Sequence, residues 1–144
     1  MTTTDISPAP AIALIGAGTI GTAWAVVFAS AGMAGRLYDA EASRLPAARD
    51  MARARLGDLA AHGLIDGDVD AIMANITPAA ELGAALDGAD HAQENAPEDL
   101  ALKRDLLARI AETAPATCTI ARSTSFIERG RARPLHRNGH GRPL

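Results

Sequence analysis

Apolar residues along this chain fall into short unbroken runs that alternate with longer segments in which they recur every three or four positions. Short runs of this kind are typical of buried strands, and the longer spacing is typical of helices that pack on one face. Gly, Pro, Asn and Asp, which favour turns, lie between them. The pattern predicts strands at 11–15, 36–39, 75–77, 91–95 and 118–121, and helices at 23–31, 41–61, 64–73, 82–86 and 98–113.

This alternation predicts an α/β fold with a doubly wound, mostly parallel sheet, because parallel strands are joined through right-handed helical crossovers. We expect the strands, numbered along the chain, to lie in the order 3-2-1-4-5. Asp66 or Asp68 should lie near the start of the short helix, and Pro97 should open the last one. The apolar positions that share one face of the second or the last helix are Met51, Leu56, Leu59, Leu102, Leu106, Leu107 and Ile110.

A glycine turn, residues 16–21, joins the first strand directly to the first helix. In a strand–turn–helix unit of this kind, Gly16 allows the sharp turn and Gly18 lets backbone amides approach a pyrophosphate. Gly21 lets the helix pack closely on the strand. The helix N-terminus, with Thr19 and Ile20, then offers N–H groups and a positive dipole end to the anion. The turn therefore predicts a dinucleotide phosphate site.

Asp39 ends the second predicted strand and lies 18 residues beyond Gly21. An acidic residue about 20 residues after the glycines binds a ribose 2′-hydroxyl in dinucleotide-binding folds and repels a 2′-phosphate, so it favours NAD over NADP. Arg36 and Arg44 flank this position and would weaken the preference, which leaves NADP open. The alternative interpretation is that Asp39 caps a helix that begins near Ala40.

Composition narrows the class of protein. A chain of 144 residues with 48% hydrophobic and 22% charged residues corresponds to one globular domain, whose core must come from Ala, Leu, Ile and Val because aromatics are only 3%. No apolar run approaches the roughly 18 residues of a membrane span, and residues 1–10 lack the pattern of a secretory signal. The net charge of −3 gives no electrostatic case for nucleic-acid binding. We expect neither a membrane nor a nucleic-acid partner.

Cys118 is the only cysteine, so an intrachain disulfide is impossible and a thiolate metal cluster is not expected. Its place in a predicted strand favours a small hydrophobic residue over a reactive thiol. The single cysteine, together with the missing signal, predicts a cytoplasmic protein without a bound metal.

The two ends of the chain depart from the alternating pattern. Residues 1–10 are rich in Thr, Ser and Pro and are expected to be flexible. Residues 128–144 hold five arginines and one glutamate, which gives them a charge of +4 and leaves −7 on the rest. Since they show no periodicity, we expect residues 126–144 to form a disordered basic tail. The tail lacks the aromatic residues that stack on bases, so no nucleic-acid function is assigned to it.

Two further segments carry a family resemblance. Residues 89–103, with Gln93 and Glu94, and residues 120–125, with Ser123-Thr124-Ser125, resemble the NAD-binding domain of the 3-hydroxyacyl-CoA dehydrogenase family. Within it they are more similar to the branch that acts on small hydroxy acids, the lambda-crystallin (gulonate dehydrogenase) and carnitine dehydrogenase group. The resemblance covers residues 11–125.

The resemblance implies a Rossmann-type fold, NAD as cofactor, and hydride transfer between NAD and the C3 hydroxyl of a 3-hydroxyacyl-CoA or a small 3-hydroxy acid. It places Glu98 and Lys103 beside the nicotinamide, and Ser125 at the oxygen of a small-molecule substrate. From the residues alone, Glu98 is an acid in the first turn of a helix and Ser123–Ser125 is a polar loop. The cofactor contacts that the resemblance implies are Gly16, Gly18, Thr19, Ile20, Gly21, Asp39, Glu98 and Lys103.

The C-terminal end departs from the family pattern. The family has a catalytic His roughly twenty residues after the serine, then Asn and Pro, a later Glu and a helical C-terminal domain. Only 19 residues follow Ser125, and His136 and His140 do not match that pattern. Arg122 stands where a small residue is expected. We therefore expect an incomplete enzyme with little turnover, as a homo-oligomer or with a complementing helical domain, whose tail comes from a frameshifted or truncated reading frame.

Other functions stay open beside this one. The chain fits a nucleotide-binding module or one half of a split enzyme without catalysis of its own, and it also fits the product of a gene remnant. Another NAD-dependent Rossmann dehydrogenase would share the glycine turn but not the segment from Glu94 to Lys103.

Overall fold

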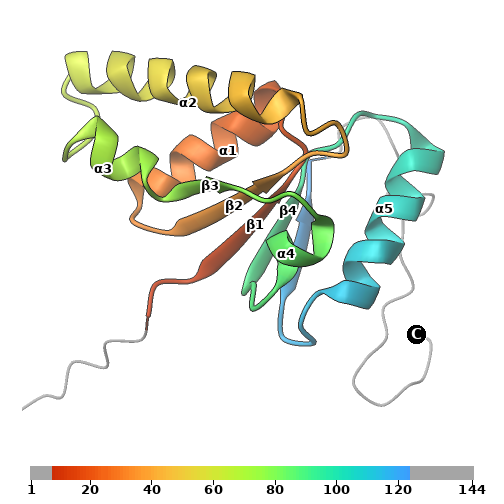
Figure 1. Ribbon diagram of the computed structural model, residues 1–144. Helices are drawn as coiled ribbons and strands as arrows, with labels where there is room; N and C mark the ends of the chain where they lie inside the picture. Colours follow the sequence, from red (N-terminus) through yellow and green to blue (C-terminus); the bar gives the residue numbers. More distant parts are fainter. Residues whose placement is uncertain (1–7, 124–144) are drawn as a thin grey trace, which may run out of the picture.

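The computed structural model describes residues 8–123, which form a five-stranded parallel sheet with helices on both faces (Figure 1). The expected flexible N-terminus largely, and the expected basic tail entirely, lie outside the described residues. The elements are β1 (Ala11–Ile15), α1 (Thr19–Ser30), β2 (Ala34–Tyr38), α2 (Arg44–Ala61), α3 (Val69–Met73), β3 (Ile76–Pro78), α4 (Leu82–Leu86), β4 (His91–Glu94), α5 (Leu100–Thr113) and β5 (Thr119–Arg122).

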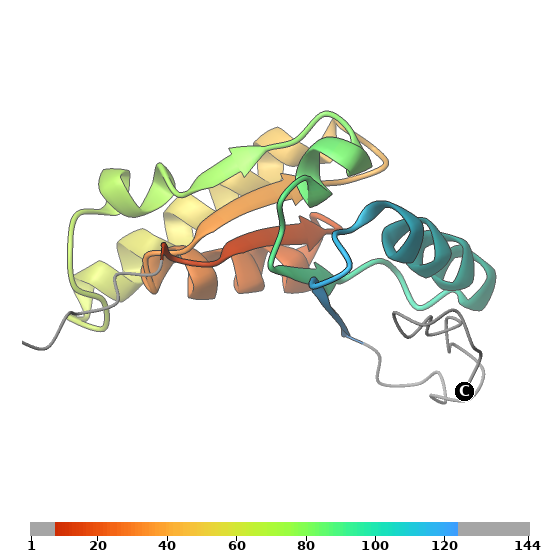
Figure 2. The same ribbon diagram turned by 90° about the horizontal axis from the view of Figure 1, so that it is seen from below.

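The strand order is β3-β2-β1-β4-β5 with every pair parallel, which confirms the predicted order and fold class. From β1 the chain moves outward through β2 to β3, then crosses to β4 and moves outward the other way. Because right-handed crossovers in opposite directions use opposite faces, α1, α2 and α3 lie on one face and α4 and α5 on the other (Figures 1 and 2).

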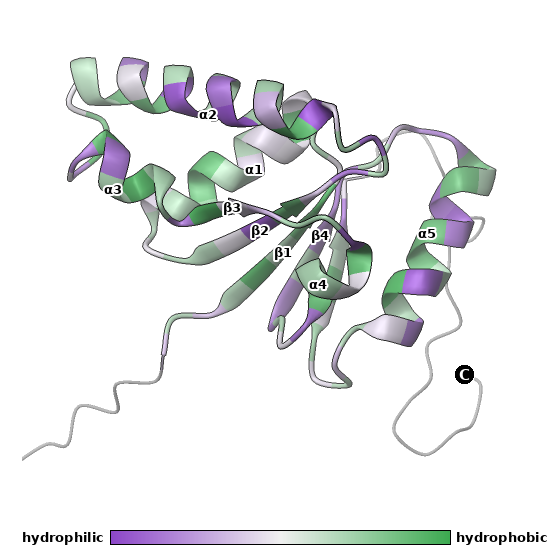
Figure 3. Cartoon of the chain, in the orientation of Figure 1, coloured by the Kyte–Doolittle hydropathy of each residue, from purple (hydrophilic) through white to green (hydrophobic). Residues whose placement is uncertain are grey.

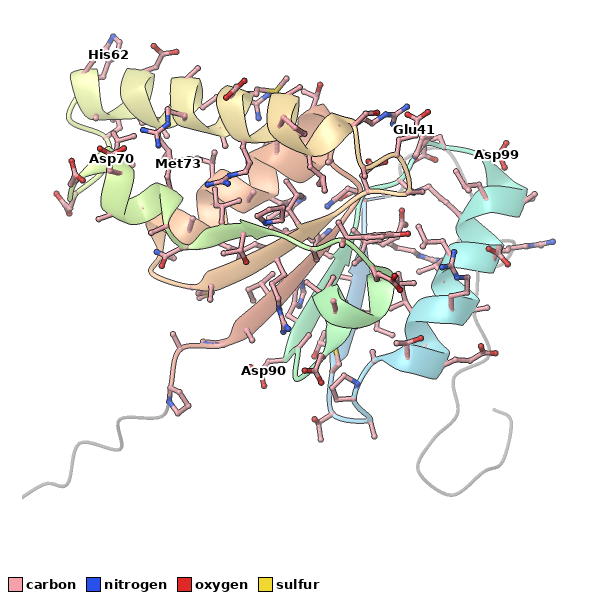
Figure 4. The ribbon with its side chains drawn as sticks, viewed as in Figure 1. Glu41, His62, Asp70, Met73, Asp90 and Asp99 are labelled. Atoms are coloured by element: carbon pink, nitrogen blue, oxygen red, sulfur yellow. The ribbon has the colours of Figure 1, made fainter. Side chains whose placement is uncertain are left out.

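All five strands end at the same edge of the sheet because they are parallel. Figure 4 shows this edge: Glu41, which follows β2, and Asp99, which follows β4, lie at one end of the molecule. Asp90, which precedes β4, lies at the opposite end. The loop after each strand therefore meets the others at the carboxyl edge, where ligands bind in open α/β folds.

β1 is apolar along its whole length because both of its faces are covered (Figure 3). Ile12 and Leu14 belong to a core with α1, α2 and α3. Ala13 and Ile15 belong to a second core with α4 and α5. The two cores hold the glycine turn, which leaves the end of β1, between the two layers of helices.

Cys118 packs against the second core, just before β5. Burial, and then the charge of Asp90, raise the pKa of its thiol above the usual value. A raised pKa keeps the thiol protonated near neutral pH, which supports the prediction of a small hydrophobic residue over a reactive one. No helix between residues 8 and 123 is long and apolar enough to cross a membrane.

Three helices begin at other residues than predicted. α1 begins at Thr19, directly on the glycine turn, rather than at residue 23. α2 begins at Arg44 rather than at residue 41. α5 begins at Leu100 because the Asp99 carboxylate caps it and accepts a hydrogen bond from the N–H of Leu102 at 2.8 Å. The prediction that Pro97 opens this helix is therefore wrong by three residues, whereas Asp68 does cap α3.

The buried faces of α2 and α5 also differ from the predicted ones. On α2, Leu56 is fully buried as expected, but Met51 is 40% exposed, because the buried face runs through Leu45, Ala48, Ala52 and Leu56. On α5, Leu102 is 44% exposed and the neighbouring Lys103 is buried in its place. The buried positions of α5 are Lys103, Leu106, Leu107 and Ile110.

Candidate functional site

The glycine turn begins at a residue that only glycine fits. Gly16 has a φ of +103°, in the region that side chains rarely adopt. A Cβ at this position would lie 2.9 Å from both the carbonyl carbon and the oxygen of Asn95, and 3.0 Å from the nitrogen of Ala96. The turn after β1 therefore rests directly on the Asn95–Ala96 peptide, which follows β4.

Gly21 closes the same turn from the helix side. A Cβ there would lie 1.8 Å from the carbonyl oxygen of Gly16, so the first turn of α1 touches the end of β1 backbone to backbone. Thr22 follows and fixes the helix start, since its hydroxyl and its N–H both donate to the carbonyl of Gly18, at 2.8 and 2.9 Å. Each of these contacts requires the small residue that the sequence has.

Gly18 is different, because nothing in the described chain lies within 4 Å of the Cβ that it lacks. It is the N-cap of α1 and provides no side-chain hydrogen bond, and the first turn of the helix holds no acidic residue. An α-helix leaves its first N–H groups without intrahelical partners, and these groups attract anions. The open space at Gly18, with Thr19 and Ile20 exposed beside it, has the form of an anion site.

The Asp39 carboxylate lies against the glycine turn. One oxygen, Oδ2, accepts a hydrogen bond from the N–H of Ala17 at 2.8 Å, and the other, Oδ1, accepts one from the N–H of Glu41 at 2.8 Å. Asp39 is not the N-cap of α2, because that helix begins at Arg44 with Ser43 before it. The alternative interpretation of Asp39 as a helix cap is therefore wrong, and its side chain stands half-buried at the carboxyl edge.

The two arginines that flank Asp39 in sequence have other partners. Arg36 donates to the carbonyl oxygens of Ala84, at 2.9 Å, and of Asp87. Arg44 forms an ion pair with Glu41 at 2.5 Å. Neither guanidinium is therefore committed to the space beside Asp39.

The residues after β4 form the opposite side of the site. The N–H of Asn95 donates to the carbonyl of Ile15 at 2.7 Å, which ties this loop to the end of β1. Just before it, Glu94 forms a fully buried ion pair with Lys103 of α5, with N–O distances of 3.0 and 3.1 Å. Glu98 is exposed in the same loop, whereas Lys103 has no exposed surface.

A chain of polar side chains extends from this loop to β5. Gln93 donates from its amide to the Ser123 hydroxyl at 3.1 Å, and that hydroxyl donates to the Asn95 amide oxygen at 2.7 Å. Sequence reasoning missed Asn95 as part of the site, although its place directly after a buried strand could have indicated it. Thr124 and Ser125 lie outside the described residues, so the predicted role of Ser125 stays a prediction.

The structure thus brings Gly16, Gly18, Gly21 and Asp39 together at one point of the carboxyl edge. Among residues 8–123, no group of three or more His, Cys, Asp or Glu side chains gathers as metal ligands would. The described site therefore consists of backbone N–H groups and one carboxylate, which suits the phosphate and the ribose hydroxyl of a dinucleotide.

The family model described as 3-hydroxyacyl-CoA dehydrogenase, NAD binding domain, matches residues 11–132. The chain belongs to this family. The expected resemblance is confirmed, and NAD, the cofactor that it implied, is the one for which this domain is described. The match extends seven residues beyond residue 125, where the resemblance in motifs ends.

Individual relatives of this NAD-binding domain agree with the family. A lambda-crystallin homolog from Bos taurus is 35% identical over 118 residues, which make up 81% of this chain and 37% of that protein. An L-carnitine dehydrogenase from Streptomyces coelicolor is 37% identical over 114 residues, 79% of this chain and 35% of that protein. The solved 3-hydroxybutyryl-CoA dehydrogenase of Escherichia coli has a TM-score of 0.78 at 31% identity, over 88% of this chain and 27% of that one. The chain spans about a third of the curated relatives it matches.

The contact at Gly21 predicts a loss of stability that does not depend on any ligand. In Gly21→Ala the new methyl group meets the Gly16 carbonyl, so we expect the free energy of unfolding to fall by about 1–3 kcal/mol or more. Gly57→Ala is the matched control, because Gly57 lies inside α2 with open space around it, and this change should stabilise the helix by up to about 1 kcal/mol. Urea unfolding of both variants without NAD measures the difference, and equal stability would contradict the contact.

Proposed function

We propose that the glycine turn and the N-terminus of α1 bind the pyrophosphate of NAD, and that Asp39 binds the adenosine ribose. The open space at Gly18, between two glycines that are packed against backbone, carries the proposal. A pyrophosphate needs close approach to backbone N–H groups, and a side chain at Gly18 would fill that space. The family of NAD-binding domains supports the same assignment.

The discrimination between NAD and NADP is assigned to Asp39. A carboxylate beside the ribose repels a 2′-phosphate, and an arginine facing it would reverse that preference. Arg36 is engaged by carbonyls of α4 and Arg44 by Glu41, so neither is held ready for a 2′-phosphate. This supports NAD over NADP.

We further propose that the whole protein transfers a hydride between NAD and the C3 hydroxyl of a 3-hydroxyacyl-CoA or a small 3-hydroxy acid. NAD supplies the hydride chemistry, and this chain binds and orients the cofactor. Relatives named as an L-carnitine dehydrogenase and a 3-hydroxyadipyl-CoA dehydrogenase support this class of small-molecule substrate. Ser125 is assigned to the substrate oxygen, and Glu98 to the nicotinamide end of the cofactor.

The remaining sequence-based expectations stay predictions. These are the domain limits at residues 11 and 125, the cytoplasmic location, and a homo-oligomer or a complementing helical domain as partner. A nucleotide-binding module without catalysis is the second candidate function. It is favoured by the coverage, since the chain spans 37% of the bovine relative.

Gly18→Val tests the pyrophosphate site. The φ of −77° and ψ of −166° at this residue are extended values that Val adopts readily, and nothing surrounds it, so the fold should persist. The branched side chain fills the anion space, and we expect NAD binding to be lost in calorimetry while circular dichroism is unchanged. Gly57→Val is the control and should retain the affinity for NAD. Unchanged NAD binding by Gly18→Val would remove the turn from the proposal.

Asp39 predicts the choice of cofactor. NAD should bind at least tenfold more tightly than NADP, which corresponds to about 1.4 kcal/mol or more. Asp39→Asn retains an oxygen for the N–H of Ala17 but loses the charge, so this preference should shrink, whereas Asp50→Asn, an exposed change on α2, should leave it intact. Titration of each variant with both cofactors measures the ratio. Equal affinities in the unchanged chain would rule out the ribose assignment.

The chain alone should show little turnover, because it holds no residue that matches the family's catalytic His. Loss of a general base lowers a rate by about 10² to 10⁴. NADH formation should therefore stay at background with a 3-hydroxyacyl-CoA, gulonate or carnitine, in a preparation whose monodispersity is checked in parallel. Robust turnover by a monodisperse preparation would show that a dismissed residue acts as the base, and His136→Ala would be the first variant to assay.

A further inference from the structure

The pair of Glu94 and Lys103 is the one ion pair printed inside the described structure with both side chains fully buried. Lys103 Nζ lies 3.1 Å from Glu94 Oε1 and 3.0 Å from Oε2, so the ammonium contacts both oxygens of the carboxylate. The pair joins the end of β4 to the buried face of α5. Burying two charges requires an excellent geometry, and on average such a pair adds little stability over well-packed apolar residues.

The carboxylate also contacts backbone at the site. Glu94 Oε1 accepts a hydrogen bond from the N–H of Ala96 at 2.5 Å. This N–H belongs to the Asn95–Ala96 peptide, against which Gly16 packs with no room for a Cβ. A line of direct contacts therefore runs from Lys103 through the Glu94 carboxylate and one peptide group to the first residue of the glycine turn.

We propose that Glu94 and Lys103 are positioning residues for the glycine turn, and that Lys103 acts on the cofactor only through Glu94. The ammonium orients the carboxylate, the carboxylate fixes the Asn95–Ala96 peptide, and that peptide sets where Gly16 lies. Lys103 has no exposed surface with which to touch a ligand. The effect on NAD rests on the proposed function of the glycine turn, whereas the effect on the turn itself does not.

Two double variants separate positioning from mere support of the fold. Glu94→Leu with Lys103→Met removes both charges and leaves the Ala96 N–H without its acceptor. Glu94→Gln with Lys103→Met also removes both charges, but the Gln amide oxygen can still accept from Ala96. Since neither variant leaves a buried charge unpaired, both are expected to fold, and urea unfolding verifies this.

Two measurements are made on the whole chain. The first is hydrogen exchange of the Ala96 and Gly16 backbone amides without any ligand, and the second is calorimetric titration with NAD. In the Leu/Met variant we expect faster exchange of Ala96 and weaker NAD binding, each by about tenfold, as for the loss of one hydrogen bond to a charged group. The Gln/Met variant should restore both toward the values of the unchanged chain.

Each failure has a distinct meaning. If the Leu/Met variant matches the unchanged chain in exchange and in affinity at equal stability, the pair only supports the fold and the proposal is overturned. If the Gln/Met variant keeps Ala96 protected but still binds NAD weakly, Lys103 touches the cofactor directly, which also overturns it. If the unchanged chain does not bind NAD at all, the proposed function fails, and amide exchange alone decides the positioning role.

Discussion

The contact between the Gly16 carbonyl and Gly21 is the constraint on which the site depends. No side chain fits between them, so the first turn of α1 can lie in only one place relative to the end of β1. That placement aims the N-terminal N–H groups of α1 at the open space beside Gly18. Because the contact joins backbone to backbone, its geometry owes nothing to side-chain rotamers, which suits a site that must exist before its ligand arrives.

The sheet topology explains why this constraint lies where a ligand can reach it. Strand order reverses between β1 and β4, so the chain leaves β1 toward one face of the sheet and β4 toward the other. Loops that diverge in this way leave a crevice at the carboxyl edge, where open α/β folds bind their ligands. Here the crevice is bounded by the glycine turn on one side and by the Asn95–Ala96 peptide on the other. Asp39 reaches the same point from β2 through the N–H of Ala17.

The sequence predicted the fold and the glycine turn well because both depend on local rules. Alternating elements and crossover handedness determine the strand order, and glycine at Gly16 and Gly21 has a steric reason that holds in any strand–turn–helix unit. The faces of α5 were harder to predict, because a periodicity of apolar residues treats Lys103 as exposed. Its burial depends on Glu94, nine residues earlier and on another element, and such tertiary pairing leaves no periodic pattern. Ser125 could not be placed either, since it lies outside the described residues.

Asp39 shows why one residue can satisfy both the fold and the ligand. Each carboxylate oxygen accepts one backbone N–H, from Ala17 and from Glu41, and an oxygen of this kind retains a second lone pair. The side chain is thus held in place by the turn and still offers acceptors for ribose hydroxyls. A group fixed in advance loses little conformational freedom on binding, so more of its hydrogen-bond energy is available for affinity. The same holds for the opposite side of the crevice, where buried Glu94 and Lys103 fix a peptide and leave its surroundings open.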